Sequence, residues 1–264
     1  MKPGLPRRHF STSRSTKSPP SASARREFDA FIFDAHAACK GKRCTMDAFA
    51  RPEGCGEDSF FVSPTVVGIA DGVGGWNENG VDPSAISRAM MRYSRQLVQG
   101  HEGDPATLST LDILTKAYAL TLKDDAVEAG STTACILKIR AGKDGEPLLE
   151  YTNLGDSGFA IVRGDKVVFR MALEDGDIIV LATDGVWDNF AQDLQEIPPF
   201  FPPVLSWRRY WHGRIDSLVS VVASRASTKE AADAVVEASL AHNLKPDDIT
   251  VIVAKVSIKP KAKL

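Results

Sequence analysis

Short apolar segments that read as β-strands follow one another along most of this chain, and this order constrains the fold more than any other feature. The segments are rich in Val, Ile and Phe and are bounded by turn residues, as in a packed sheet. The expected strands are 31–33, 60–62, 66–70, 133–139, 148–153, 159–162, 166–169, 177–181 and 249–256. Because strands and helices come in separate runs, we predict α+β packing and not a doubly wound parallel sheet.

Two pairs of segments with helical periodicity interrupt the strands. Asp82 and Ser84 lie near the start of the first helix, where polar caps are common, and Gly100 and Gly130 follow the first two helices. The expected helices are 83–98, 108–128, 215–225 and 229–241. The second pair lies close to the C-terminus, so each pair can cover a different part of the sheet structure.

The composition is that of an ordinary globular protein. Of 264 residues, 43% are hydrophobic and 25% are charged, and the length suits a single sizeable domain. The longest apolar runs, such as 178–182 and 218–223, are far shorter than the roughly eighteen residues that a membrane span needs. We therefore expect no integral membrane span.

The first 26 residues differ from the rest in charge. They contain seven basic and no acidic side chains, so residues 27–264 carry a formal charge of −9 against −2 for the whole chain. An acidic body gives little support to nucleic-acid binding. The Arg- and Ser-rich segment lacks an apolar stretch and predicts a mitochondrial transit peptide, in which Arg8-His9-Phe10-Ser11 resembles a matrix processing site. The alternative is a disordered basic tail.

Four cysteines, Cys39, Cys44, Cys55 and Cys135, are too few for a disulfide scaffold in a chain of this length. A zinc site made of His36 with the first three is conceivable, but its spacing fits no standard zinc pattern. We expect ordinary reduced thiols.

Carboxylates stand at the ends of four of the apolar strands. Strand ends of one sheet structure can converge on a single rim, so these distant positions can form one acidic pocket. The segments are Gly56-Glu57-Asp58-Ser59, Asp71-Gly72, Thr183-Asp184-Gly185 and Asp247-Asp248.

Several carboxylates brought together repel one another unless a cation neutralises them. Oxygen ligands suit Mg²⁺ or Mn²⁺, and two such ions sharing an aspartate can hold a bridging hydroxide for in-line attack on phosphorus. The pattern therefore predicts metal-assisted phosphoester hydrolysis. The alternative is a set of plain turns, as expected for Asp144-Gly145 and Asp175-Gly176, which lie between polar residues. Asp71-Gly72 differs because it continues into a glycine-rich loop.

An ordered series of motifs over about residues 55–257 resembles the type 2C (PPM) protein phosphatase family, in particular its mitochondrial subgroup with DGVGGW in place of DGHGG. The motifs are Gly56-Glu57-Asp58, Ile69-Ala70-Asp71-Gly72-Val73-Gly74-Gly75-Trp76, Gly130-Ser131-Thr132-Thr133-Ala134, Asn153-Leu154-Gly155-Asp156-Ser157-Gly158, Ala182-Thr183-Asp184-Gly185-Val186-Trp187-Asp188-Asn189 and Pro246-Asp247-Asp248-Ile249-Thr250. The resemblance implies a central sandwich of two antiparallel sheets flanked by helix pairs, in a phosphatase domain over 27–258 before a basic tail, 259–264.

The resemblance also implies roles for the acidic residues. The metal ligands would be Glu57, Asp71, the Gly72 carbonyl, Asp184 and Asp247. Asp71 would bridge two Mg²⁺ or Mn²⁺ ions, Asp58 would orient bound water, and Asp248 would stand behind the ligands. Asp71, Asp58 and Glu57 are thus the expected catalytic residues, and Asp156 is expected nearby in a structural role.

The sequence departs from the family pattern in three places. Val73 stands where many members carry a proton-donating histidine, so the leaving alkoxide needs another acid, such as bound water. Arg51 precedes Glu57 at an unusual spacing and is either a phosphate ligand or a solvated loop residue. The connection after Arg170 is short, which predicts a reduced sheet or flap, and 197–211 is a Pro- and Trp-rich stretch that reads as a packed loop or a contact surface.

The leading interpretation is a protein serine/threonine phosphatase of the mitochondrial matrix that acts on phosphoproteins and is monomeric by default. The main alternative is a weakened or inactive regulatory module that keeps the fold. A third is a metal-dependent phosphoesterase that acts on small metabolites.

Overall fold

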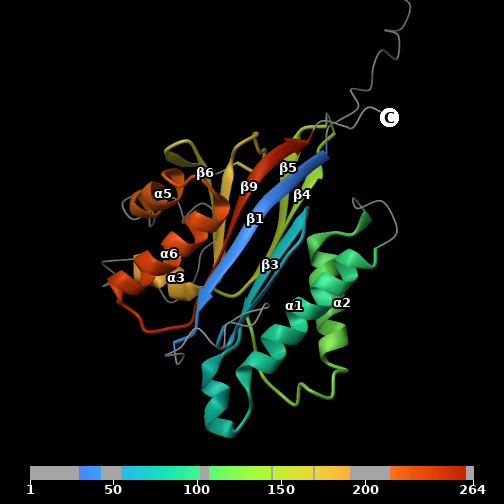
Figure 1. Ribbon diagram of the computed structural model, residues 1–264. Coiled ribbons are helices and arrows are strands. Elements are labelled where there is room, and N and C mark those ends of the chain that lie inside the picture. The colour runs from blue at the N-terminus through green and yellow to red at the C-terminus, as the bar shows by residue number, and fades with distance from the viewer. Residues whose placement is uncertain are drawn as a thin grey trace, which may run out of the picture.

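The computed structural model describes residues 30–42, 55–101, 107–143, 145–168, 170–190 and 215–259. Within these ranges two antiparallel sheets lie face to face, and helices cover both outer faces (Figure 1). The predicted α+β sandwich of two sheets is confirmed. Several features named above lie outside the described residues: 1–26, Cys44, Arg51, Asp144, 197–211 and 260–264.

The larger sheet has five strands, and every neighbouring pair in it is antiparallel. In spatial order the strands are β1 (Ala30–Lys40), β9 (Ile249–Lys259), β8 (Ile178–Ala182), β6 (Gly158–Arg163) and β7 (Lys166–Val168). The first strand is much longer than the predicted 31–33, because β1 pairs with β9 along its whole length, from Ala30 opposite Lys259 to Lys40 opposite Ile249.

The smaller sheet has four antiparallel strands in sequence order. They are β2 (Asp58–Val62), β3 (Val66–Asp71), β4 (Ala134–Ala141) and β5 (Pro147–Leu154). In Figure 1 the helices α1 (Pro83–Gln99) and α2 (Thr110–Thr121) lie on the outer side of this sheet, and α3 (Asp184–Phe190), α5 (Ile215–Ala223) and α6 (Thr228–His242) lie outside the larger sheet. No helix in the described ranges has the length and apolarity to cross a bilayer.

Three apolar layers hold this arrangement together, one between the sheets and one under each group of helices. Alternate residues of β9 face different layers: Val251 and Val253 pack against helices, whereas Ile252 and Ala254 face the opposite sheet. Burial of one such Val or Ile side chain contributes about 1.5–3 kcal/mol. A strand buried on both faces therefore needs the continuous apolar sequence found here.

Polar caps set the helix limits. Asp82 accepts a hydrogen bond from the Ser84 amide at 2.9 Å, which confirms the predicted start of α1. The predicted helix 108–128 ends earlier, at Thr121. Beyond it, the Asp124 carboxylate accepts a hydrogen bond from the Ala126 amide and contacts Arg92 of α1, which favours a turn over further helix.

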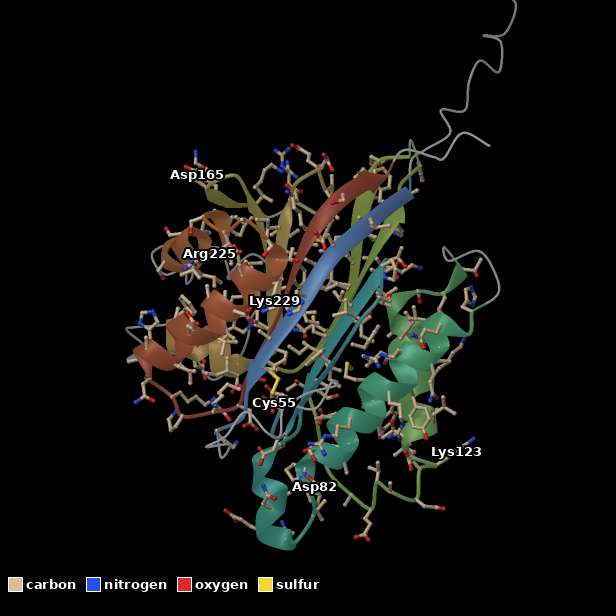
Figure 2. The ribbon with its side chains drawn as sticks, in the orientation of Figure 1. Cys55, Asp82, Lys123, Asp165, Arg225 and Lys229 are labelled. Carbon is tan, nitrogen blue, oxygen red and sulfur yellow. A yellow bond between two sulfur atoms is a disulfide. The ribbon has the colours of Figure 1, made fainter. Side chains whose placement is uncertain are left out.

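The expectation of reduced thiols was wrong for two cysteines. Cys39 at the end of β1 and Cys55 before β2 form a disulfide with a Cα–Cα distance of 5.9 Å (Figure 2). The zinc alternative fails for the same reason, because these two sulfur atoms are bonded to each other and cannot serve as thiolate ligands. Cys135 is a buried free thiol.

Removal of this disulfide is expected to lower the free energy of unfolding by about 3 kcal/mol, because the bond closes a loop of 16 residues. The measurement is urea denaturation of the double variant Cys39→Ser, Cys55→Ser beside the unchanged protein, each with and without dithiothreitol. Reductant should shift the midpoint of the unchanged protein alone. Equal midpoints in all four samples would contradict the expected contribution.

Candidate metal centre

The β2–β3 hairpin brings two of the expected site residues together. Asp58 begins β2 and Asp71 ends β3, and the two are direct partners in the antiparallel register. The Asp71 amide donates to Thr133 Oγ1 at 3.0 Å, which fixes the end of β3 against the segment before β4. Asp58 and Asp71 therefore lie at the same end of the smaller sheet, where β2 begins and β3 ends.

Two further acids lie beside strand ends of the larger sheet. Asp184 follows β8, Asp247 shortly precedes β9, and these strands are antiparallel neighbours with Ala182 opposite Val251. The end of one strand thus lies beside the start of the other. Gly185 permits this approach, because a Cβ there would lie 2.0 Å from the Asp248 carbonyl oxygen.

A hydrogen bond joins these strand ends of the two sheets. Thr183 Oγ1 donates to Asp58 Oδ2 at 3.0 Å, from the larger sheet to the smaller one. Burial raises the pKa of Asp71, and the charges of Asp58 and Asp184 raise it further. The charges of these three carboxylates therefore act on one another, and that of Asp247 also acts on Asp71. Both sheets thus contribute to one acidic rim, which consists of Asp58, Asp71, Asp184 and Asp247.

This rim has the properties of a cation site. Burial raises the pKa of Asp58, and among the described residues Asp58 Oδ1 and Asp184 Oδ1 are buried without a hydrogen-bond partner. A divalent cation with its bound water would supply partners for these oxygens and offset the repulsion between the carboxylates. No group of three or more His, Cys, Asp or Glu side chains in the described ranges forms a ready-made metal cage. Carboxylate oxygens, as hard donors, suit Mg²⁺ or Mn²⁺, which bind through a few carboxylates and retain water ligands.

Glu57 lies between the rim and the glycine-rich loop. Its Oε1 accepts a hydrogen bond from Asn77 Nδ2 at 2.8 Å, within the 3₁₀ helix η2 (Gly74–Asn79). A Cβ on Gly74 would stand 2.6 Å from Glu57 Oε2, so a larger residue there would force the Glu57 carboxylate to shift. The loop after Asp71 therefore packs on Glu57 and differs from a plain turn.

Asp248 anchors the segments that carry the other site residues. Its carboxylate accepts the Lys42 amide at 2.6 Å and the Glu57 amide at 2.8 Å. Gly56 lies against it with φ of +59°, and a Cβ there would be 2.3 Å from Asp248 Oδ1. The side chain thus holds the end of β1 and the start of β2 in place, behind the rim.

Two lysines that the sequence analysis did not single out contact the acids. Lys42 Nζ lies 2.9 Å from Glu57 Oε2 and 3.0 Å from Asp247 Oδ1. Lys245 Nζ lies 3.2 Å from Asp247 Oδ2 and also forms an ion pair with Asp184. The adjacency of Lys245 to Pro246-Asp247-Asp248 was a usable signal, whereas Lys42 had none, since it is 205 residues from Asp247.

The remaining predicted residues are placed less centrally. The Asp156 side chain is exposed. Partial desolvation nevertheless raises its pKa, and the charge of Asp184 raises it further, so Asp156 lies within electrostatic reach of the rim. Val73 exposes 46% of its surface and offers no proton donor. The Arg51 prediction lies outside the described residues.

Curated relatives of this chain are protein phosphatases, although no protein-family model matches it. It is 36% identical over 175 residues to the protein phosphatase PTC7 homolog of Homo sapiens, covering 51% of this chain and 56% of that one. It is 29% identical over 260 residues to the PTC7 homolog fig of Drosophila ananassae, covering 77% and 74% of the two chains. The chain thus spans little more than half the length of several curated relatives that it matches.

Solved structures with this fold are phosphatases as well. The photosystem II phosphatase PBCP aligns with a TM-score of 0.63 at 22% identity, over 85% of this chain and 99% of that one. The catalytic domain of the serine/threonine phosphatase PstP, in complex with two manganese ions, aligns with a TM-score of 0.55 at 17% identity, over 86% and 100%. At these identities the comparison supports the fold alone, so the chemistry must be argued from the residues of this chain.

Proposed function

We propose that this chain is a phosphatase of the type 2C (PPM) family, as its similarity to named protein phosphatases and its fold suggest, and that it hydrolyses phosphoserine and phosphothreonine in proteins. The observation that carries the proposal is the acidic rim, where carboxylates from the ends of both sheets meet with buried oxygens that lack partners. Repulsion among these groups calls for bound cations, and oxygen donors select Mg²⁺ or Mn²⁺.

In the proposed site, Asp71 and the Gly72 carbonyl would hold divalent cations together with Asp184, Asp247 and Glu57. Two divalent cations held there would polarise water for attack on phosphorus and offset the charge of the phosphoryl group. Asp58, whose Oδ2 accepts a hydrogen bond from the Thr183 hydroxyl, would orient water at the rim. Val73 cannot protonate the leaving alkoxide, so that proton comes from water or from another acid.

A phosphothreonine peptide assay of the full chain with EDTA, Mg²⁺ or Mn²⁺ tests this proposal. We expect cation-dependent phosphate release from the peptide that exceeds release from sugar and nucleotide phosphates at equal concentration. Preference for the small phosphates would replace the protein substrate with a metabolite.

A non-catalytic regulatory module is the second candidate, and the lysine contacts favour it, because two ammonium groups already engage oxygens of the proposed ligands. Folded protein that binds phosphopeptide and Mn²⁺ without releasing phosphate in the same assay would establish it.

We further propose that the protein acts in the mitochondrial matrix, on the basis of the basic, acid-free composition of residues 1–26. A fluorescent fusion lacking 1–26 is expected to lose mitochondrial import while the full chain retains it. Import of the shortened fusion would show that this segment does not target the protein.

A further inference from the structure

Lys42 and Lys245 form ion pairs with three of the proposed metal ligands, Glu57, Asp184 and Asp247. Both oxygens of Asp247 contact an ammonium group: Oδ1 lies 3.0 Å from Lys42 Nζ, and Oδ2 lies 3.2 Å from Lys245 Nζ. Lys245 also pairs with Asp184 and, at 2.9 Å, with Asp188. Resting on the proposed function, we propose that Lys42 and Lys245 are tethered counter-cations that compete with divalent ions and so set the ion concentration that the site requires.

Competition follows from the geometry of the shared oxygens. A Mg²⁺ or Mn²⁺ ion would lie about 2.1 Å from its ligand oxygen, which brings it close to an ammonium group that hydrogen-bonds to the same carboxylate. Two cations on one carboxylate also repel each other. Each oxygen of Asp247 already contacts one ammonium group, so an ion that binds Asp247 competes with both lysines. Lys245 also shares Asp184 with such an ion, and Lys42 shares Glu57.

The lysines are held close even when their ammonium groups move away. The Lys42 amide donates to Asp248 Oδ1 at 2.6 Å, and the Lys245 amide donates to Asn189 Oδ1 at 3.1 Å. Both backbones are thus fixed, while each long side chain has several rotatable bonds through which its ammonium group can move. A tethered cation of this kind acts at a high effective concentration, so it competes at every concentration of free ion.

These contacts differ from an ordinary surface ion pair of the same chain. Lys229 and Asp233 also form a pair, at 2.6 Å, but both side chains are largely exposed and lie four residues apart on α6. Such a pair contributes little to stability and nothing to the rim. Lys229 therefore serves as the matched control for the loss of one lysine charge.

The test is a calorimetric titration of the chelator-treated full chain with Mn²⁺, for the unchanged protein and the variants Lys245→Gln, Lys42→Gln and Lys229→Gln. We expect Mn²⁺ to bind about tenfold tighter to each of the first two variants and unchanged to the third. A second readout is the melting temperature: with EDTA the two rim variants should melt below the unchanged protein, and saturating Mn²⁺ should remove the difference.

The outcomes separate this inference from the proposed function. If the unchanged protein binds Mn²⁺ and releases phosphate from the peptide, but both rim variants bind Mn²⁺ no more tightly than it does, the competition is refuted and the phosphatase stands. If the unchanged protein binds no Mn²⁺, both ideas fail. Should Lys245→Gln not fold, the result for Lys42→Gln decides alone, since Lys42 meets the same carboxylate independently.

Discussion

Asp71→Asn is expected to lower the turnover of a phosphothreonine peptide by at least about 10³-fold, the effect of losing several kcal/mol of transition-state stabilisation. Asp71 lies opposite Asp58 and interacts with Asp184, so an uncharged amide there removes the group proposed to hold both ions. The fold should persist, because asparagine has the same shape and relieves repulsion among the neighbouring carboxylates. Steady-state kinetics with saturating Mn²⁺ and a thermal melt measure both effects.

Asp175→Asn is the matched control, since it makes the same chemical change in an exposed turn before Gly176. Its kcat and melting temperature should equal those of the unchanged protein. If Asp71→Asn kept the original rate, or if both variants lost activity to the same extent, the proposed role of Asp71 would be wrong.

The stability of the chelator-treated protein is expected to fall as the pH is raised from about 4 to about 8. Burial raises the pKa of Asp58 from 3.8 to about 8, so the folded state binds the proton more tightly than the unfolded state does. The resulting stabilisation is fully present below the unfolded pKa and disappears as the pH rises through the folded value. Asp71, whose pKa burial and its neighbours also raise, acts in the same direction.

Thermal melts in EDTA across this range, repeated with Mn²⁺, measure the effect. Mn²⁺ should restore most of the lost stability at pH 8, because an ion that binds only the folded state stabilises it. The Asp71→Asn variant should show a flatter dependence on pH in EDTA. A melting temperature that rises with pH in the unchanged, chelated protein would contradict the assignment of buried, repelling carboxylates.

The α+β class could be predicted because the information is local, whereas the two-sheet sandwich was implied by the family resemblance. Apolar strands such as 249–256 and the polar cap at Asp82 are visible in a few adjacent residues. The acids at strand ends were also visible, since each follows or precedes an apolar run. Their roles as ligands remain predictions, but the structure places Asp58, Asp71, Asp184 and Asp247 along one rim.

The features that sequence reasoning missed depend on contacts between distant segments. The disulfide joins Cys39 to Cys55 because β1 extends along β9 well beyond the predicted 31–33, a consequence of pairing that single-strand propensity does not contain. Helix α3 begins at Asp184, where Asp-Gly reads as a turn, and it forms because Val186 and Phe190 are buried against the larger sheet. Lys42 reaches Asp247 only through this same tertiary arrangement.

The most direct test of the central claim follows bound Mn²⁺ and phosphate release in the same samples while the ion is titrated into the chelator-treated full chain. We predict about two ions bound per chain at saturation, with release from a phosphothreonine peptide rising as they bind. Phosphate release that persists undiminished in EDTA, or a folded protein that hydrolyses the peptide without binding any ion, would contradict a two-ion phosphatase centre at this rim.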